Sequence, residues 1–144
     1  AIGTCLSIPS GDACPVEWNQ LGQYRHFADT RGLLQPDTTS IALPDIGSYQ
    51  IHWILTYSRR GPGMRKASLM WWGSNGEEVG WHSAADGNEV EANPDGETTL
   101  VGHATVYSDG TNKIKLVTNQ DSGKVLVLSD RTYECQLHVY HLAP

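Results

Sequence analysis

Residues 48–58 read SYQIHWILTYS and follow the turn residues of segment 44–47, Pro-Asp-Ile-Gly. Successive side chains of a β-strand point to opposite faces. One face of this run is aromatic and aliphatic throughout: Tyr49, Ile51, Trp53, Leu55 and Tyr57. The other face is mixed: Gln50, His52, Ile54, Thr56 and Ser58. The pattern predicts a long strand with one face on a core and the other against a half-polar surface, which we expect a neighbouring subunit to supply.

Strand signals recur along the rest of the chain. Alternating segments at 39–43, 67–72, 78–82, 99–107, 113–118, 124–128 and 133–142 are separated by turns rich in Gly, Asn, Asp and Pro. The pair Asn75-Gly76 favours a tight hairpin turn. We expect the polar stretch 83–98 to be an exposed loop around a short strand near Val90. Regularly spaced antiparallel strands of this kind predict an all-β sandwich.

Length and charge narrow the classes of protein. The chain has 144 residues, enough for one domain with a full core, and a formal net charge of −6, which argues against a nucleic-acid binder. The basic cluster Arg59, Arg60, Arg65 and Lys66 is either a solvated loop or a contact for an anion or acidic glycan. No apolar run approaches the ~20 residues of a membrane span. The sequence starts at Ala1 without Met, so we expect a processed protein or a fragment of a longer one.

The three cysteines fall into two groups. Cys5 and Cys14 flank a short loop, and a disulfide between them could stabilise the N-terminal segment by up to ~3 kcal/mol; two free thiols are the alternative. Cys135 alternates with Leu137 and Val139, as a small buried apolar residue does. Neither a CxxC pair nor the Cys/His spacing of a zinc site is present.

Three local patterns, in this order, resemble the C1q/tumour-necrosis-factor-like jelly-roll superfamily. Segment 41–51 resembles its short strand, turn and Gly-x-Tyr strand, and segment 69–76 resembles its strand that ends in an Asn-Gly turn. Segments 102–107, 114–116, 125–128 and 136–142 match its last strands in order. The resemblance implies a jelly-roll head over 38–144. Residues 1–37 then form an N-terminal segment, either a stalk junction or an extension that covers the sandwich.

The resemblance also implies a compact homotrimer. One sheet of such a trimer packs around the threefold axis, so its strands need apolar groups on both faces. A monomer would leave that apolar and aromatic surface in water. The residues expected at the trimer interface are His52, Ile54, Tyr107, His138 and Tyr140.

Exposed tryptophans near polar loops suit sugar stacking or protein hot spots, although core or interface aromatics are the simpler interpretation. The candidate ligand-binding residues are Trp72, Trp81, His82, Arg59 and Arg60. Trp71 and Trp72 are neighbours on a strand, so one of them should point outward. We expect a non-enzymatic head of a trimeric fibre or collagen-like surface protein. It would lie outside the cell, on a cell or virion surface, and attach to glycans or glycoproteins.

Two other functions stay open. One is a structural trimerisation head without its own ligand, and the other is a carbohydrate-active hydrolase with a carboxylate pair such as Asp86 and Glu89. The HExxH, GxSxG and phosphate-loop motifs are absent, so we expect no enzyme.

We expect no cofactor. The acidic stretch 86–97 could offer oxygen ligands to Ca²⁺, although it lacks EF-hand spacing. A threefold axis could gather one histidine from each chain, with His52, His103 and His138 as candidates. Satisfied interface histidines are the simpler interpretation of these three residues.

Overall fold

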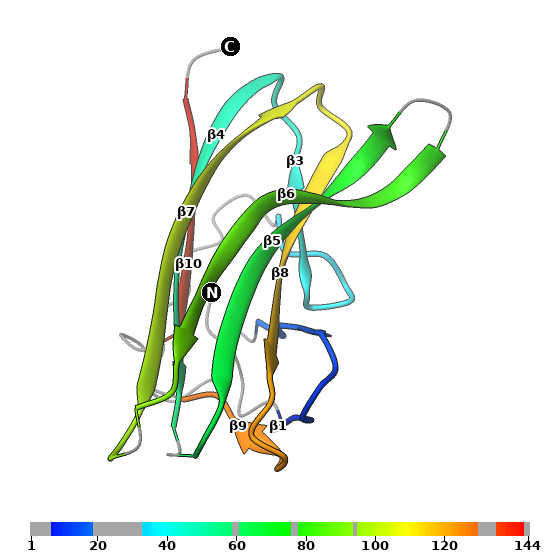
Figure 1. The fold of residues 1–144 in the computed structure, drawn as a ribbon. Coiled ribbons are helices and arrows are strands. Elements are labelled where there is room, and N and C mark those ends of the chain that lie inside the picture. The colour runs from blue at the N-terminus through cyan, green and yellow to red at the C-terminus, as the bar shows by residue number, and fades with distance from the viewer. Residues whose placement is uncertain are drawn as a thin grey trace.

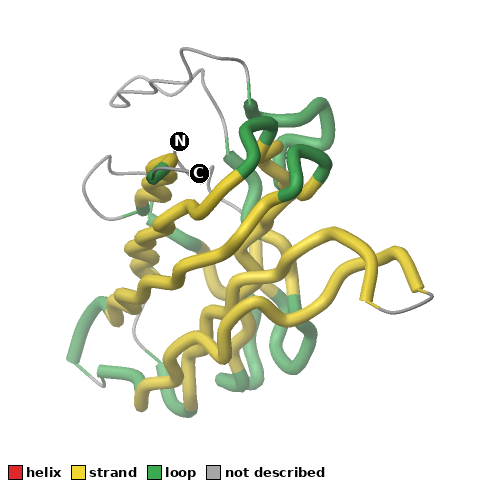
Figure 2. The backbone as a smooth tube through the Cα atoms, turned by 90° about the horizontal axis from the view of Figure 1, so that it is seen from above, coloured by secondary structure: helices red, strands yellow, loops and turns green. Residues whose placement is uncertain are grey.

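The computed structural model describes residues 7–18, 33–58, 61–75, 78–93, 95–129 and 135–142. All regular secondary structure within these ranges is β-strand (Figures 1 and 2), which confirms the expected all-β class. The strands are β1 (Ser7–Ile8), β2 (Cys14–Pro15), β3 (Ser40–Leu43), β4 (Gly47–Tyr57), β5 (Met64–Asn75), β6 (Glu78–Glu91), β7 (Thr98–Ser108), β8 (Asn112–Gln120), β9 (Leu126–Val127) and β10 (Gln136–His141).

The strands form two layers (Figure 1). One layer is a three-stranded sheet in the order β10-β4-β7. The other is a five-stranded sheet in the order β2-β8-β5-β6, with β3 also paired to β8, and β1 pairs separately with β9. Every pairing is antiparallel. This arrangement confirms the predicted antiparallel sandwich.

The core lies between the two sheets, and β4 supplies much of it. Tyr49, Ile51, Trp53, Leu55 and Tyr57 are each at most 2% exposed, so the predicted inward face of β4 is confirmed. Leu69 of β5 and Leu116 of β8 face them from the other sheet and are fully buried. Burying an apolar side chain of this size stabilises the fold by roughly 1.5–3 kcal/mol. The alternation along β4 therefore fixes which side of the strand is inside.

Trp53 fits under β7 only because its cross-strand partner is Gly102. A Cβ atom at residue 102 would lie 2.2 Å from Cζ2 of the Trp53 indole. Contacts that short do not occur between non-bonded carbon atoms, whose optimal separation is about 3.5–4.0 Å. The absence of a side chain at Gly102 thus lets β7 lie close to the Trp53 indole, the largest side chain of the three-stranded sheet.

The prediction of an exposed loop at 83–98 is largely wrong, because β6 continues without interruption to Glu91. The register of β5 against β6 shifts between Ala67 and Met70, which absorbs extra residues of β6. Gly87 makes this possible, since a Cβ there would lie 1.2 Å from the Ala67 carbonyl oxygen. In the five-stranded sheet β6 pairs with β5 alone, and an edge strand tolerates polar side chains.

The hairpin of β5 and β6 extends beyond the body of the sandwich, both in the ribbon of Figure 1 and in the backbone tube of Figure 2. Asn75 pairs with Glu78, so residues 76 and 77 connect the strands where the Asn-Gly turn is predicted.

The described part of the N-terminal segment packs on the sandwich. β1 pairs with β9, β2 pairs with β8, and Val16 and Trp18 are fully buried. Cys14 has no disulfide partner among the described residues, and Cys5 lies outside them, so the bridge between the two stays a prediction. Cys135 is fully buried, as its alternation indicates. The division of the chain at residue 38 also stays a prediction.

Candidate functional site: a histidine face and a tryptophan pair

The outward side of the three-stranded sheet forms one continuous surface, which we call the histidine face. Cross-strand partners set its membership, because directly opposed residues share a face of the sheet. Its described residues include no Lys, Arg, Asp or Glu. Its residues are Gln50, His52 and Ile54 of β4; Val101, His103, Thr105 and Tyr107 of β7; and Gln136, His138 and Tyr140 of β10, with Leu142 just beyond.

Large apolar side chains on the histidine face reach solvent. Val101 and Tyr107 are each 60% exposed, and Tyr140 is 52% exposed. Scattered exposed apolar residues are ordinary on a protein surface, but a grouped set without charges is not. Protein interfaces are depleted of charged residues at their core and enriched in aromatic ones. The composition of this face is that of an interface core.

The histidines of this face form a row across the sheet. His138, His52 and His103 occupy the same register on β10, β4 and β7. The His52 ring lies 6.0 Å from the His103 ring and 6.0 Å, edge-on, from the Tyr140 ring, measured between centroids. Tyr140 also stacks on His138 at 6.2 Å, so four aromatic rings form a chain of three contacts in the order His103, His52, Tyr140 and His138.

His138 is exposed by surface area, yet its surroundings affect its charge. Partial burial lowers the pKa of its imidazole, and the neighbouring His52 lowers it further. Its Nε2 atom lies 2.8 Å from Oε1 of Gln136. Burial and the neighbouring His52 favour the neutral form of the ring.

All five residues predicted for the trimer interface lie on the histidine face: His52, Ile54, Tyr107, His138 and Tyr140. Their role as an interface stays a prediction. Sequence reasoning missed Val101 as a member. Its signal is the alternation with His103, Thr105 and Tyr107, opposite the inward residues Leu100, Gly102, Ala104 and Val106.

Trp72 and Trp81 form a pair on the outward side of the other sheet. They are cross-strand partners on β5 and β6, their rings meet edge to face at 5.5 Å, and both are partly exposed. The ammonium group of Lys115 lies 4.2 Å from the centre of the Trp81 ring, a cation–π contact. Trp71 packs against the core instead, which confirms that the two adjacent tryptophans point to opposite faces.

His82, another predicted ligand residue, does not join this pair. His82 is the cross-strand partner of Trp71, on the core side of the sheet, and its Nε2 is buried without a hydrogen-bond partner. Arg59 and Arg60 lie outside the described residues. Arg65 belongs to neither alternative for the basic cluster, because it is fully buried, donates to the carbonyls of Gly61, Pro62 and Met64, and stacks on Tyr57.

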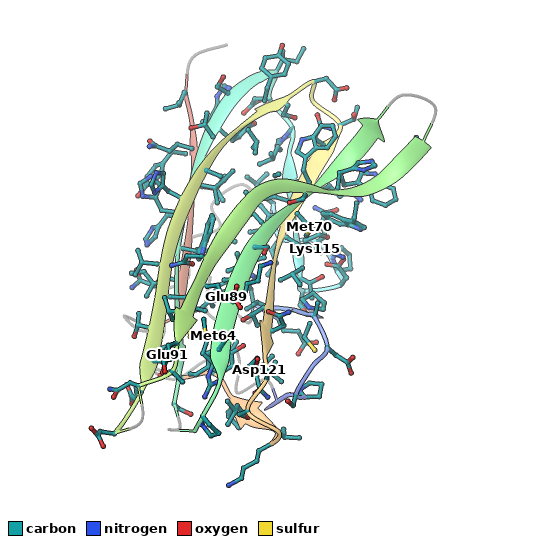
Figure 3. The ribbon with its side chains drawn as sticks, in the orientation of Figure 1. Met64, Met70, Glu89, Glu91, Lys115 and Asp121 are labelled. Atoms are coloured by element: carbon teal, nitrogen blue, oxygen red, sulfur yellow. The ribbon has the colours of Figure 1, made fainter. Side chains whose placement is uncertain are left out.

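A polar groove lies on the same outward side, further along β5 from the tryptophan pair, and sequence reasoning missed it. Its volume is about 250 Å³. In Figure 3, Met64, Glu89 and Asp121 lie below Met70 and Lys115. The groove forms because Glu89, Lys66 and Asn119 share one register position on three strands, which only strand pairing reveals. Its lining residues are Gly11, Met64, Lys66, Glu89, Asn119, Gln120 and Asp121.

The described side chains support neither of the two alternatives raised by the sequence, a metal site and a hydrolase with a carboxylate pair. Within the described ranges, no three or more His, Cys, Asp or Glu side chains group so that they could hold a metal ion. Of the suggested carboxylate pair, Glu89 is exposed, and the Asp86 side chain lies outside the described ones. No helix in the described part of the chain is long and apolar enough to cross a membrane.

Comparison with known proteins finds similarity of structure only. No family model matches the sequence, and no curated protein matches it. The structure of murine APRIL at pH 5.0 matches with a TM-score of 0.62 and 11% identity, over 97% of this chain and 99% of that chain. The globular domain of zebrafish complement 1qA matches with a TM-score of 0.54 and 11% identity, over 99% and 93%. Eiger TNF from S. frugiperda matches with a TM-score of 0.57 and 11% identity, over 99% and 94%.

These matches span nearly the full length of both partners in each comparison. Identities near one residue in ten carry the fold and nothing finer about binding. The chain therefore has the C1q/tumour-necrosis-factor-like jelly-roll fold that its strand pattern resembles.

Proposed function

We propose that this chain is a non-enzymatic recognition head that assembles into a homotrimer through its histidine face. The observation that carries the proposal is the absence of charge from an exposed, partly aromatic sheet face built from β10, β4 and β7. A monomer would leave this apolar surface in water at a free-energy cost that burial against a second copy removes. Members of the resembling superfamily are typically compact homotrimers, which supports a closed threefold assembly.

The tryptophan pair is the ligand-binding site in this proposal, and a cell-surface glycan or glycoprotein is its ligand. Trp72 and Trp81 offer two ring systems inclined by 63° beside a lysine, on the side of the sandwich away from the histidine face. Aromatic rings stack on the apolar faces of sugars, and a nearby ammonium donates hydrogen bonds. Three such sites on one rigid head would raise weak single affinities through avidity.

Molar mass in solution tests the assembly. Sedimentation equilibrium at micromolar concentration should give three times the chain mass of 15.8 kDa. Tyr140→Glu places a charge in the covered face and should yield monomers, because an unpaired buried charge is strongly destabilising. Val125→Glu is the matched control, since Val125 is 58% exposed on a different surface and should stay trimeric. A monomeric unmodified chain would overturn the proposal.

A glycan array followed by titration tests the ligand. Trp72→Ala and Trp81→Ala should each weaken binding of a retained glycan at least tenfold, whereas Met70→Ala, a neighbouring outward residue of β5, should leave binding within about twofold. Saturable binding without products supports a recognition head, and turnover of the glycan indicates the hydrolase. Trimers that retain no glycan and no glycoprotein would indicate the structural trimerisation head.

A further inference from the structure

Half of the six histidines in the chain stand in one row of the histidine face. The row results from strand register, because His52, His103 and His138 are far apart in the sequence and become direct neighbours only through the pairings of β4 with β7 and β10. Imidazole is the side chain most often used to bind zinc, copper and nickel ions. A cross-strand pair of imidazoles fixes two such ligands on a rigid sheet.

His52 and His103 have ring nitrogens that the protein leaves available. The two rings are 6.0 Å apart between centroids and inclined by 39°. Neither residue makes a hydrogen bond through its ring within the described part of the chain, and both side chains are exposed. His138 differs, because its Nε2 is held by Gln136 at 2.8 Å and its ring stacks on Tyr140. The available pair is therefore His52 with His103.

We propose that His52 and His103 chelate one divalent first-row transition-metal ion, with Zn²⁺ as the representative. Two imidazoles on one tetrahedral zinc, with Zn–N distances of ~2.1 Å, stand with ring centres about 5 Å apart. The two rings stand 6.0 Å apart and both side chains are exposed, so we expect side-chain rotation to bring them to that separation. None of the described lysines and arginines lies on this face to repel the ion, and the net charge of the chain is −6.

Two protein ligands leave two zinc positions open, and these point away from the sheet. On the histidine face they point toward the copy of the chain that covers it in the proposed trimer. Zinc would then stabilise the assembly by binding the trimer more tightly than the monomer. This link to assembly rests on the proposed function, whereas the chelate within one chain does not.

Isothermal titration of the full metal-free chain with ZnCl₂ at pH 7.5 tests the chelate. We expect one Zn²⁺ per chain with micromolar affinity, and at least tenfold weaker binding in His52→Asn and in His103→Asn. His141→Asn is the matched control, since His141 packs on Tyr49 at the rim of the core and lies off the row. Cys14→Ser should also bind normally, which excludes a thiol as the ligand.

Three results would overturn the chelate: no saturable binding, binding that survives both histidine substitutions, or one zinc per three chains, which would indicate a site on the threefold axis. Molar mass with and without a chelator then tests the link to assembly. A trimer that ignores the chelator overturns that link alone. A monomer that still binds one Zn²⁺ through His52 and His103 supports the chelate and refutes the proposed trimer.

Discussion

The two outward faces of the sandwich differ sharply in charge although both belong to antiparallel sheets in one domain. The histidine face has no charged residue at the outward positions that the structure describes, and Val101, Tyr107 and Tyr140 are exposed on it. The outward face of β8, β5 and β6, here called the charged face, carries Lys66, Lys113, Lys115, Glu89 and Glu91 around its tryptophan pair. Solvent-exposed surfaces carry charged side chains, whereas the cores of protein–protein interfaces are depleted of them. In the proposed function, the histidine face is therefore the surface for assembly and the charged face is the surface for recognition.

The largest expected effect comes from making the histidine face resemble the charged one. Val101→Lys should raise the dissociation constant of the trimer by a factor of at least a hundred, since an unpaired buried charge costs about 3–5 kcal/mol. Val79→Lys is the matched control, because Val79 is 65% exposed and Val101 is 60% exposed. Sedimentation equilibrium measures both variants. Equal masses for the two variants would remove the distinction between the faces.

The second effect concerns the backbone beneath the histidine face. Gly102→Ala should cost about 3 kcal/mol of unfolding free energy, because its Cβ would lie 2.2 Å from the Trp53 indole and the overpacking strains β4 and β7. Gly80→Ala on β6 has open space at the Cβ position and should change stability by less than about 0.5 kcal/mol. Urea unfolding measures the two variants. A Gly102→Ala protein as stable as the parent would contradict the close approach of the two strands.

The third effect concerns the hydrogen bond between Tyr57 and Thr118, which links the two sheets. Tyr57 of β4 lies 2.7 Å from the Thr118 hydroxyl of β8, and Thr118 in turn donates to the Lys66 carbonyl, so Tyr57 is the donor to Thr118. Burial raises the pKa of the Tyr57 phenol from 10.0 to about 12, against smaller opposing effects of Thr118 and of Arg65.

Because its pKa is raised, the Tyr57 phenol stays neutral in the folded protein at pH values at which it is already ionised in the unfolded chain. The contribution of Tyr57 is thus complete below pH 10 and is lost as the pH rises from 10 to 12, by about 2 kcal/mol. The Tyr57→Phe protein should lose less stability over that window than the parent in urea titrations. Parallel losses in both proteins would show that Tyr57 does not carry the effect.

The smallest effect is that of salt on assembly. Because the histidine face has no charged side chains, raising NaCl from about 0.05 to 0.5 M should change the trimer dissociation constant by less than about threefold. Binding of an acidic glycan beside Lys115 should weaken much more over the same range, and binding of a neutral glycan should not. Strong salt dependence of the trimer would place charged groups at the real interface.

Sequence pattern predicted much of the fold, and particular residues show why. The burial of Tyr49, Ile51, Trp53, Leu55 and Tyr57 follows from period-two alternation, which is local to one strand. The opposite orientations of Trp71 and Trp72 follow from the same rule. The continuation of β6 through Gly87 could not be predicted, because it depends on where the backbone of Ala67 on β5 comes close to it.

The site was only partly predictable for the same reason. Tyr107 and Tyr140 were recognised as outward residues, but Val101 and the charge-free character of the whole face were not, since the face combines three strands from distant parts of the chain. His82 was grouped with Trp81 because the two are adjacent in sequence, yet adjacent strand residues point to opposite sides.

The sequence by itself determined most of the strands, their inward faces and the chemistry available at each position, because alternation is encoded within a few residues. Tertiary structure alone decided which strands became neighbours and in which register. That register placed His138, His52 and His103 in one row and made Trp72 and Trp81 cross-strand neighbours. It also buried Arg65, although the sequence groups this residue with Arg59, Arg60 and Lys66 in a basic cluster. Pairing between distant strands is a cooperative property of the whole sandwich, fixed by packing of both sheets on one core, and no local stretch of residues contains it.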